Sequence, residues 1–193
     1  VKLSSNENPL GPSPAAAEAV KASVSSLMLY PSSDHAPLRH AIAEVHGLDA
    51  DRIIIGVGSD EIIAFLCQAY VGPGDEVIVP ALTFISVGAT IVRAGGRPIF
   101  VDVDRDRLVM SSDAVRAAIT DKTVGIIPVH TYGHPCAMGE LKDLADEHGL
   151  FVLEDTCEAL GAQVQGAPVG GLGDVGVHSF YANKMITTGN GGA

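Results

Sequence analysis

The segment Phe151-Val152-Leu153-Glu154-Asp155 runs three apolar residues directly into two carboxylates. A short apolar run of this kind is typical of a strand buried on both faces of a parallel sheet. Successive side chains of a strand point to opposite faces, so we expect one of the two carboxylates to face a crevice at the end of the strand. The alternative is an acidic strand end exposed to solvent.

Similar β-branched runs occur on both sides of this segment, and amphipathic stretches separate them. We expect strands over residues 52–57, 76–79, 98–101, 124–129, 150–154 and 175–181. The helices expected between them cover residues 60–71, 85–94, 113–119 and 138–148. This alternation predicts an α/β fold, a three-layer α/β/α sandwich around a mostly parallel sheet. Ligands of such sheets bind at the carboxyl ends of the strands.

The N-terminal part is expected to form an extended arm and two helices. Residues 5–14 contain three prolines. Ser13 is a suitable N-cap for a helix over residues 14–27, and a second helix is expected over 36–46. We therefore divide the chain into an arm and helix (1–32) and one larger domain (33–193).

Composition and charge restrict the classes of partner. Hydrophobic residues make up 47% of the 193 residues and charged residues 18%, which is typical of a folded chain. The net charge of −11 argues against nucleic acid and against an anionic membrane surface. No apolar run reaches the ~20 residues of a membrane span. Small molecules remain the expected partners.

The cysteines, histidines and termini bear on cellular location, metal binding and the completeness of the chain. We see no secretion signal, and the three cysteines have no C-x-x-C spacing, so we expect reduced thiols and a cytoplasmic location. The histidine spacing matches no metal site. Because the chain begins with Val1 and ends on Gly-Gly-Ala, we expect a fragment of a longer protein.

Lys184 follows the expected strand 175–181 and precedes a segment rich in threonine and glycine, residues 187–192. Glycine lets the backbone approach a ligand closely. With Asp155 on the end of a neighbouring strand, this lysine suits pyridoxal phosphate, since a lysine can form a Schiff base while a carboxylate keeps a ring nitrogen protonated. Taken alone, a lysine in a loop is usually a solvated surface charge.

The turn Gly56-Val57-Gly58-Ser59-Asp60-Glu61 is expected to join a strand to a helix. Free amides at a helix N-terminus form a phosphate site. An ordinary helix start, with acidic residues complementing the helix dipole, is the alternative. The dinucleotide pattern G-x-G-x-x-G fails because Glu61 occupies its third glycine, so a dehydrogenase is disfavoured.

Motifs in two parts of the chain carry family resemblances. Those in residues 1–80 are Asn6-Glu7-Asn8-Pro9-x-Gly11-Pro12, Tyr30-Pro31, Gly58-Ser59-Asp60-Glu61 and Pro73-Gly74-Asp75-Glu76-Val77. Those in residues 81–193 are Thr83-Phe84, Val101-Asp102-Val103-Asp104, Ile127-Pro128-Val129-His130, Glu154-Asp155-Thr156-Cys157-Glu158-Ala159-Leu160-Gly161 and Ser179-x-x-x-x-Lys184. The first part resembles histidinol-phosphate aminotransferases and the second resembles DegT/DnrJ/EryC1/StrS sugar aminotransferases. Both are fold-type I pyridoxal-phosphate enzymes.

The resemblance implies roles around the cofactor ring. Lys184 would attach to the cofactor and shuttle a proton, while Asp155 would pair with the ring nitrogen. Phe84 would stack on the ring, although it could instead be a buried core aromatic. Glu158 would stand near the phenolic oxygen of the cofactor, at a position where the sugar enzymes commonly have glutamine or histidine.

The resemblance also implies a phosphate site and a dimer. Ser179 and the amides of Gly58, Ser59 and Asp60 would hold the phosphate. Tyr30 would reach the phosphate of a partner subunit, which implies a homodimer.

The expected reaction is transfer of an amino group from an amino acid to a keto acceptor, a keto-sugar nucleotide. The sugar-family dehydratases lack the lysine, so transamination ranks above dehydration. One alternative is a histidinol-phosphate or amino-acid aminotransferase. Another is a catalytically silent, truncated or recombined domain, because both families continue into a small C-terminal domain that this chain lacks.

Overall fold

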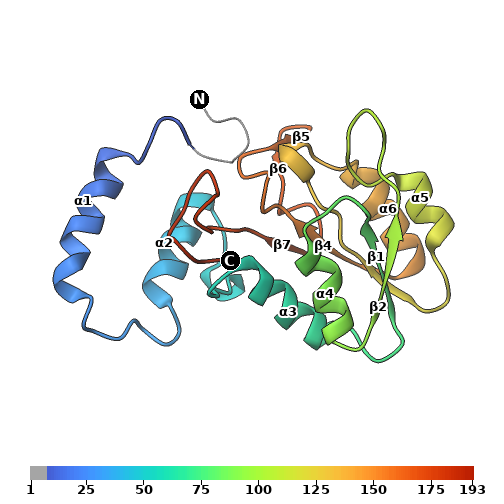
Figure 1. Ribbon diagram of the computed structural model, residues 1–193, viewed down its shortest axis with the longest axis horizontal. Helices are drawn as coiled ribbons and strands as arrows, with labels where there is room; N and C mark the ends of the chain where they lie inside the picture. Colours follow the sequence, from blue (N-terminus) through green and yellow to red (C-terminus); the bar gives the residue numbers. More distant parts are fainter. Residues whose placement is uncertain (1–7) are drawn as a thin grey trace. The chain divides into compact units, whose positions relative to one another are not determined.

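Ser13 caps the first helix as predicted, since its Oγ accepts a hydrogen bond from the Ala16 amide at 3.1 Å. The computed structural model describes residues 8–193 (Figure 1), so residues 5–7 of the expected arm lie outside the described part. The elements of this N-terminal part are α1 (Pro14–Ser23), η1 (Val24–Ser26), α2 (Ala36–His46) and η2 (Ala50–Arg52). They belong to a compact unit that ends at Ile55, and a second unit spans Gly56–Ala193. The predicted functional division between residues 32 and 33 stays a prediction.

Short apolar runs form the sheet of the second unit. Within the described residues, five parallel strands lie in the order β2-β1-β3-β4-β7. Their bounds are β1 (Glu76–Pro80), β2 (Arg97–Val101), β3 (Thr123–Ile126), β4 (Phe151–Asp155) and β7 (Val175–Val177). The predicted α/β fold with a parallel sheet is confirmed.

Helices cover both faces of this sheet (Figure 1). Their bounds are α3 (Ser59–Tyr70), α4 (Ile85–Arg93), α5 (Ser112–Ala118) and α6 (Met138–His148). Alternation along β1 divides the core, because Val77 and Val79 pack with α3 and α4 while Ile78 packs with α5 and α6. The result is the predicted three-layer sandwich.

The connections of β1 locate a ligand crevice. β1 pairs with both β2 and β3, and the helices on either side of β2, α4 and α5, pack on opposite faces. The strand order therefore reverses between β1 and β3. Ligands of open α/β sheets bind at such a reversal, beyond the carboxyl ends of the strands.

Three sequence expectations about strands need correction. Residues 52–57 form no strand: within the described part of the chain, only Gly56 among them pairs, through a single bridge to Gly192. β3 ends at Ile126, before a proline that cannot donate to a ladder. β7 ends at Val177, after which the chain pairs with residues 191–193. Three short elements were not predicted from the sequence: η3 (Thr131–Gly133), β5 (Gln163–Val164) and β6 (Ala167–Pro168).

Candidate active site

A cavity of about 710 Å³ lies where the sheet topology places a ligand. Its walls come from the start of α3 and from the segments that follow β1, β3, β4 and β7. Eight of the nine residues expected to bind the cofactor line it: Gly58, Ser59, Asp60, Phe84, Asp155, Glu158, Ser179 and Lys184. The ninth, Tyr30, belongs to the N-terminal unit, where its side chain is fully exposed.

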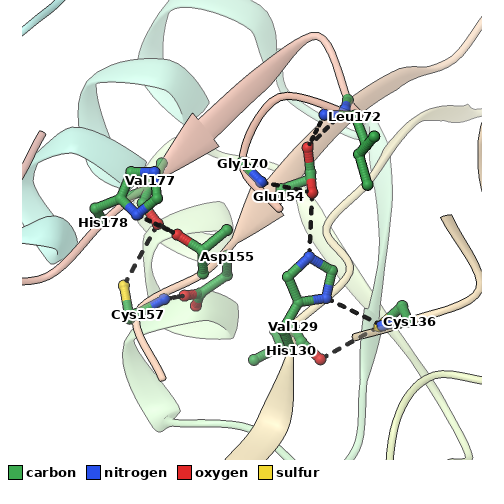
Figure 2. A network of polar contacts seen from close by, with 12 residues as sticks. Val129, His130, Cys136, Glu154, Asp155, Cys157, Gly170, Leu172, Val177 and His178 are labelled. Carbon is green, nitrogen blue, oxygen red and sulfur yellow. Dashed lines mark hydrogen bonds and ion pairs between the residues drawn. The ribbon is translucent and has the colours of Figure 1, made fainter. Parts of the chain in front are cut away.

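Asp155 ends β4 and is buried, with 5% of its surface exposed. Its Oδ1 accepts a hydrogen bond from the Cys157 amide at 3.0 Å. Burial raises the pKa of the Asp155 carboxyl, although the Cys157 contact and the charge of Lys184 act in the opposite direction. The preceding Glu154 is fully buried on the other face of the strand (Figure 2). The alternative that this strand end is exposed to solvent is therefore wrong.

Lys184 lies in the loop after β7 and is half-buried in the cavity wall. Its backbone amide donates to the Tyr181 carbonyl at 2.9 Å, which anchors the loop. Its side chain forms no ion pair within the described residues. Its positive charge is nevertheless close enough to Asp155 to act on the pKa of that carboxyl. The amine is therefore available to a ligand rather than fully solvated.

The turn before α3 presents free amides to the cavity. Gly58 is the N-cap of α3, and Glu61 Oε2 accepts the Val57 amide at 2.8 Å, which fixes the turn. The amides of Ser59 and Asp60 have no acceptor within residues 8–193, as expected for the first turn of a helix. Two free amides at a helix N-terminus favour an anion.

A close backbone approach joins this turn to the segment after β7. Gly56 and Gly192 exchange backbone hydrogen bonds of 3.0 and 3.1 Å, and Gly192 also bridges to Ser179. A Cβ at position 192 would lie 2.4 Å from the Ser59 nitrogen, so only glycine fits there. The two serines predicted to hold one phosphate thus belong to segments that are joined directly.

Phe84 and Glu158 complete the expected ring contacts. Phe84 immediately precedes α4 and is 68% exposed at the cavity, so the alternative of a buried core aromatic is wrong. Glu158 Oε2 accepts the amide of Tyr132 at 2.9 Å. Tyr132 has a φ of 54°, a left-handed conformation that this hydrogen bond helps to hold.

Several residues that line the cavity had no predicted role: Leu82, Thr83, Ser86, Thr131, Tyr132, Cys157, Tyr181, Asn183 and Asn190. Thr83 is the most informative, because its Oγ1 is buried without a hydrogen-bond partner in the described residues. Its place beside Phe84 in the quoted motif was the available signal.

The residues present fit pyridoxal phosphate. The free amides of Ser59 and Asp60 suit a phosphate, Asp155 suits a protonated ring nitrogen, and Lys184 supplies an amine. The buried Thr83 hydroxyl has no hydrogen-bond partner among residues 8–193, so it could contact a bound ligand. Within the described part of the chain, no cluster of three or more His, Cys, Asp or Glu side chains could hold a metal ion.

A parallel α/β sheet that brings a lysine and a buried carboxylate to one cavity has the architecture expected of fold-type I pyridoxal-phosphate enzymes. The model of the DegT/DnrJ/EryC1/StrS aminotransferase family matches residues 15–193, and the chain belongs to this family. No helix within residues 8–193 has the length and apolar character needed to cross a membrane.

Individual relatives fall into both groups that the motifs suggested. The chain is 61% identical over 160 residues to a histidinol-phosphate aminotransferase of Dinoroseobacter shibae, which covers 80% of this chain and 44% of that protein. It is 44% identical over 153 residues to the UDP-N-acetyl-3-dehydro-alpha-D-glucosamine 3-aminotransferase of Acidithiobacillus ferrooxidans, covering 78% and 42%. The chain spans less than half the length of either protein.

A solved structure supports the fold assignment. The aminotransferase TlmJ from Streptoalloteichus hindustanus superposes with a TM-score of 0.87 at 31% identity, covering 97% of this chain and 51% of TlmJ. The chain therefore corresponds to about half of TlmJ.

Proposed function

We propose that residues 33–193 are the cofactor-binding part of a pyridoxal-phosphate-dependent aminotransferase that moves an amino group from an amino acid to a keto-sugar nucleotide. One observation carries this proposal: the buried Asp155 carboxylate and the Lys184 amine line the same cavity. A buried carboxylate is costly without a cationic partner, and a protonated ring nitrogen would be that partner.

Each side chain at the ring would have one task. When bound, the cofactor supplies a reactive aldehyde and a ring that accepts an electron pair. Lys184 would bind the aldehyde carbon through Nζ and then move a proton at the substrate carbon. Asp155 would keep the ring nitrogen protonated, and the exposed face of Phe84 would pack over the ring. Glu158 would border the ring beside the Tyr132 amide.

The phosphate would lie at the start of α3. The hydroxyls of Ser59 and Ser179 and the amides of Gly58, Ser59 and Asp60 would hold it. The Asp60 carboxylate is engaged elsewhere, since it accepts the Ser86 hydroxyl at 2.8 Å. We propose a cytoplasmic homodimer in which the exposed Tyr30 reaches the phosphate of the partner subunit.

A spectral titration with pyridoxal phosphate tests the cofactor assignment. The wild-type protein should gain a visible absorbance band, because the covalent bond from Lys184 Nζ shifts the cofactor's absorbance. Lys184→Ala should bind the cofactor without that band, while the exposed Lys122→Ala should match the wild type. An unchanged band in Lys184→Ala would refute the assignment. A wild-type protein that stays colourless would favour the silent domain.

The substrate has two candidates because the relatives disagree. The sugar-nucleotide name of the Acidithiobacillus ferrooxidans relative and the family match support a keto-sugar nucleotide. The 61% identity to a histidinol-phosphate aminotransferase favours imidazole-acetol phosphate instead. A screen of both acceptor classes against a panel of amino-acid donors separates the two. Turnover of keto-sugar nucleotides alone is expected, and turnover of imidazole-acetol phosphate alone would reverse the assignment.

A further inference from the structure

A polar network lies behind Asp155, on the opposite face of β4 (Figure 2). Its centre is Glu154, which is fully buried. The Glu154 carboxylate accepts four hydrogen bonds: from the amides of Gly170 (2.9 Å), Leu172 (2.6 Å) and Gly173 (2.6 Å) and from His130 Nε2 (3.1 Å). Burial acts to raise the pKa of Glu154, but these four donors hold it below its ordinary value. Glu154 is therefore a buried carboxylate whose charge the fold stabilises.

The protonation of His130 follows from its other contact. His130 is fully buried, and its Nδ1 accepts the Cys136 amide at 3.1 Å. An accepting Nδ1 carries no proton, so the proton of the neutral ring is on Nε2 and is donated to Glu154. The pair is thus a neutral imidazole bound to a carboxylate.

Pro128 and His130 bracket Asp155 through the main chain. The His130 amide donates to the Asp155 carbonyl at 3.0 Å, and the Asp155 amide donates to the Pro128 carbonyl at 2.9 Å. His130 therefore contacts two adjacent residues of β4: its side chain bonds Glu154, and its backbone amide bonds the Asp155 carbonyl. Together these two hydrogen bonds close a ring. Asp155 cannot shift along β4 without breaking this ring.

We propose that Glu154 and His130 are positioning residues that fix the place of the Asp155 carboxylate at the cavity. This inference rests on the proposed function, since the group that Asp155 would contact is the protonated ring nitrogen of the cofactor. Neither residue touches the cavity itself, because both are fully buried and neither lines it.

The test compares two ligands, pyridoxal phosphate and its analogue with carbon in place of the ring nitrogen. The ratio of their dissociation constants isolates the Asp155 contact, because the two ligands differ only at that atom. A hydrogen bond to a charged group predicts a wild-type ratio of about tenfold or more. Glu154→Gln and His130→Leu should bring the ratio close to one. His130→Gln, which keeps a donor, and the exposed Glu140→Gln should keep the wild-type ratio.

The outcomes separate the two levels of the argument. A wild-type ratio near one contradicts the proposed function, and the positioning role with it. A clear wild-type ratio that Glu154→Gln and His130→Leu preserve, or that Glu140→Gln also loses, overturns the positioning role alone. If Glu154→Gln and His130→Leu both fail to fold by circular dichroism, the pair serves stability only and the proposal is overturned.

Discussion

Replacing Asp155 by asparagine is expected to stabilise the cofactor-free protein while weakening its binding of pyridoxal phosphate. Burial raises the pKa of Asp155 in the folded protein. Between the pKa of the unfolded chain and that of the folded protein, the folded protein therefore keeps a proton on Asp155 that the unfolded chain has released. Folding is then penalised as the pH rises above about 3.8, the ordinary value, and the penalty levels off above the pKa in the folded state. Asparagine removes this penalty while its Oδ1 can still accept the Cys157 amide.

The effects on stability and on cofactor affinity have opposite signs, and both are large enough to measure. The cofactor-free variant should gain about 1 kcal/mol of unfolding free energy at neutral pH, the lower end of the cost of a poorly satisfied buried polar group. Its dissociation constant for pyridoxal phosphate should rise about 10- to 100-fold, because a hydrogen bond to a charged group is lost.

Urea unfolding of the cofactor-free proteins between pH 4 and pH 8 measures the first effect, and equilibrium titration measures the second. The exposed Asp143→Asn serves as the matched control and should leave both quantities unchanged. A variant that is less stable than the wild type at pH 7, with no change in the pH dependence, would refute the reasoning about the buried charge.

Two pairs of substitutions test the polar core and the packing by urea unfolding. Glu154→Gln should cost about 2–5 kcal/mol, since the amide end of glutamine faces two buried N–H donors, whereas Glu140→Gln should cost almost nothing. Gly125→Ala should cost about 1–3 kcal/mol, because its Cβ would lie 2.3 Å from a ring carbon of Phe151. Gly139→Ala in α6 should instead add about 0.5–1 kcal/mol, because no atom lies within 4 Å of its Cβ. Equal destabilisation by the two glycine substitutions would contradict the packing described.

Most strands and helices of the second unit, and the parallel sense of its sheet, were predictable from local patterns, but the strand order and several strand ends were not. α6 has the expected bounds because its apolar spacing and the glycine that ends it are local features. Residues 52–57 had an equally strong β-branched run, yet they form no strand, because a strand needs consecutive backbone pairs and residues 8–193 give this segment a single bridge, from Gly56 to Gly192.

The candidate site shows the same limit. Alternation along β4 predicted that one of Glu154 and Asp155 would face the crevice, but the choice depends on contacts distant in sequence. The turn at residues 170–173 donates three backbone amides to the Glu154 carboxylate. No sequence pattern predicted these hydrogen bonds. That the Thr83 hydroxyl is buried without a partner in the described residues likewise follows only from the assembled fold.

The attachment of the cofactor to a single lysine tests the account most directly. Borohydride reduction of the pyridoxal-phosphate-loaded protein makes that bond permanent, and peptide mass spectrometry then locates it. We expect the added mass on the peptide that contains Lys184, the last lysine of the chain. Label on a different lysine, or spread over several, would contradict it.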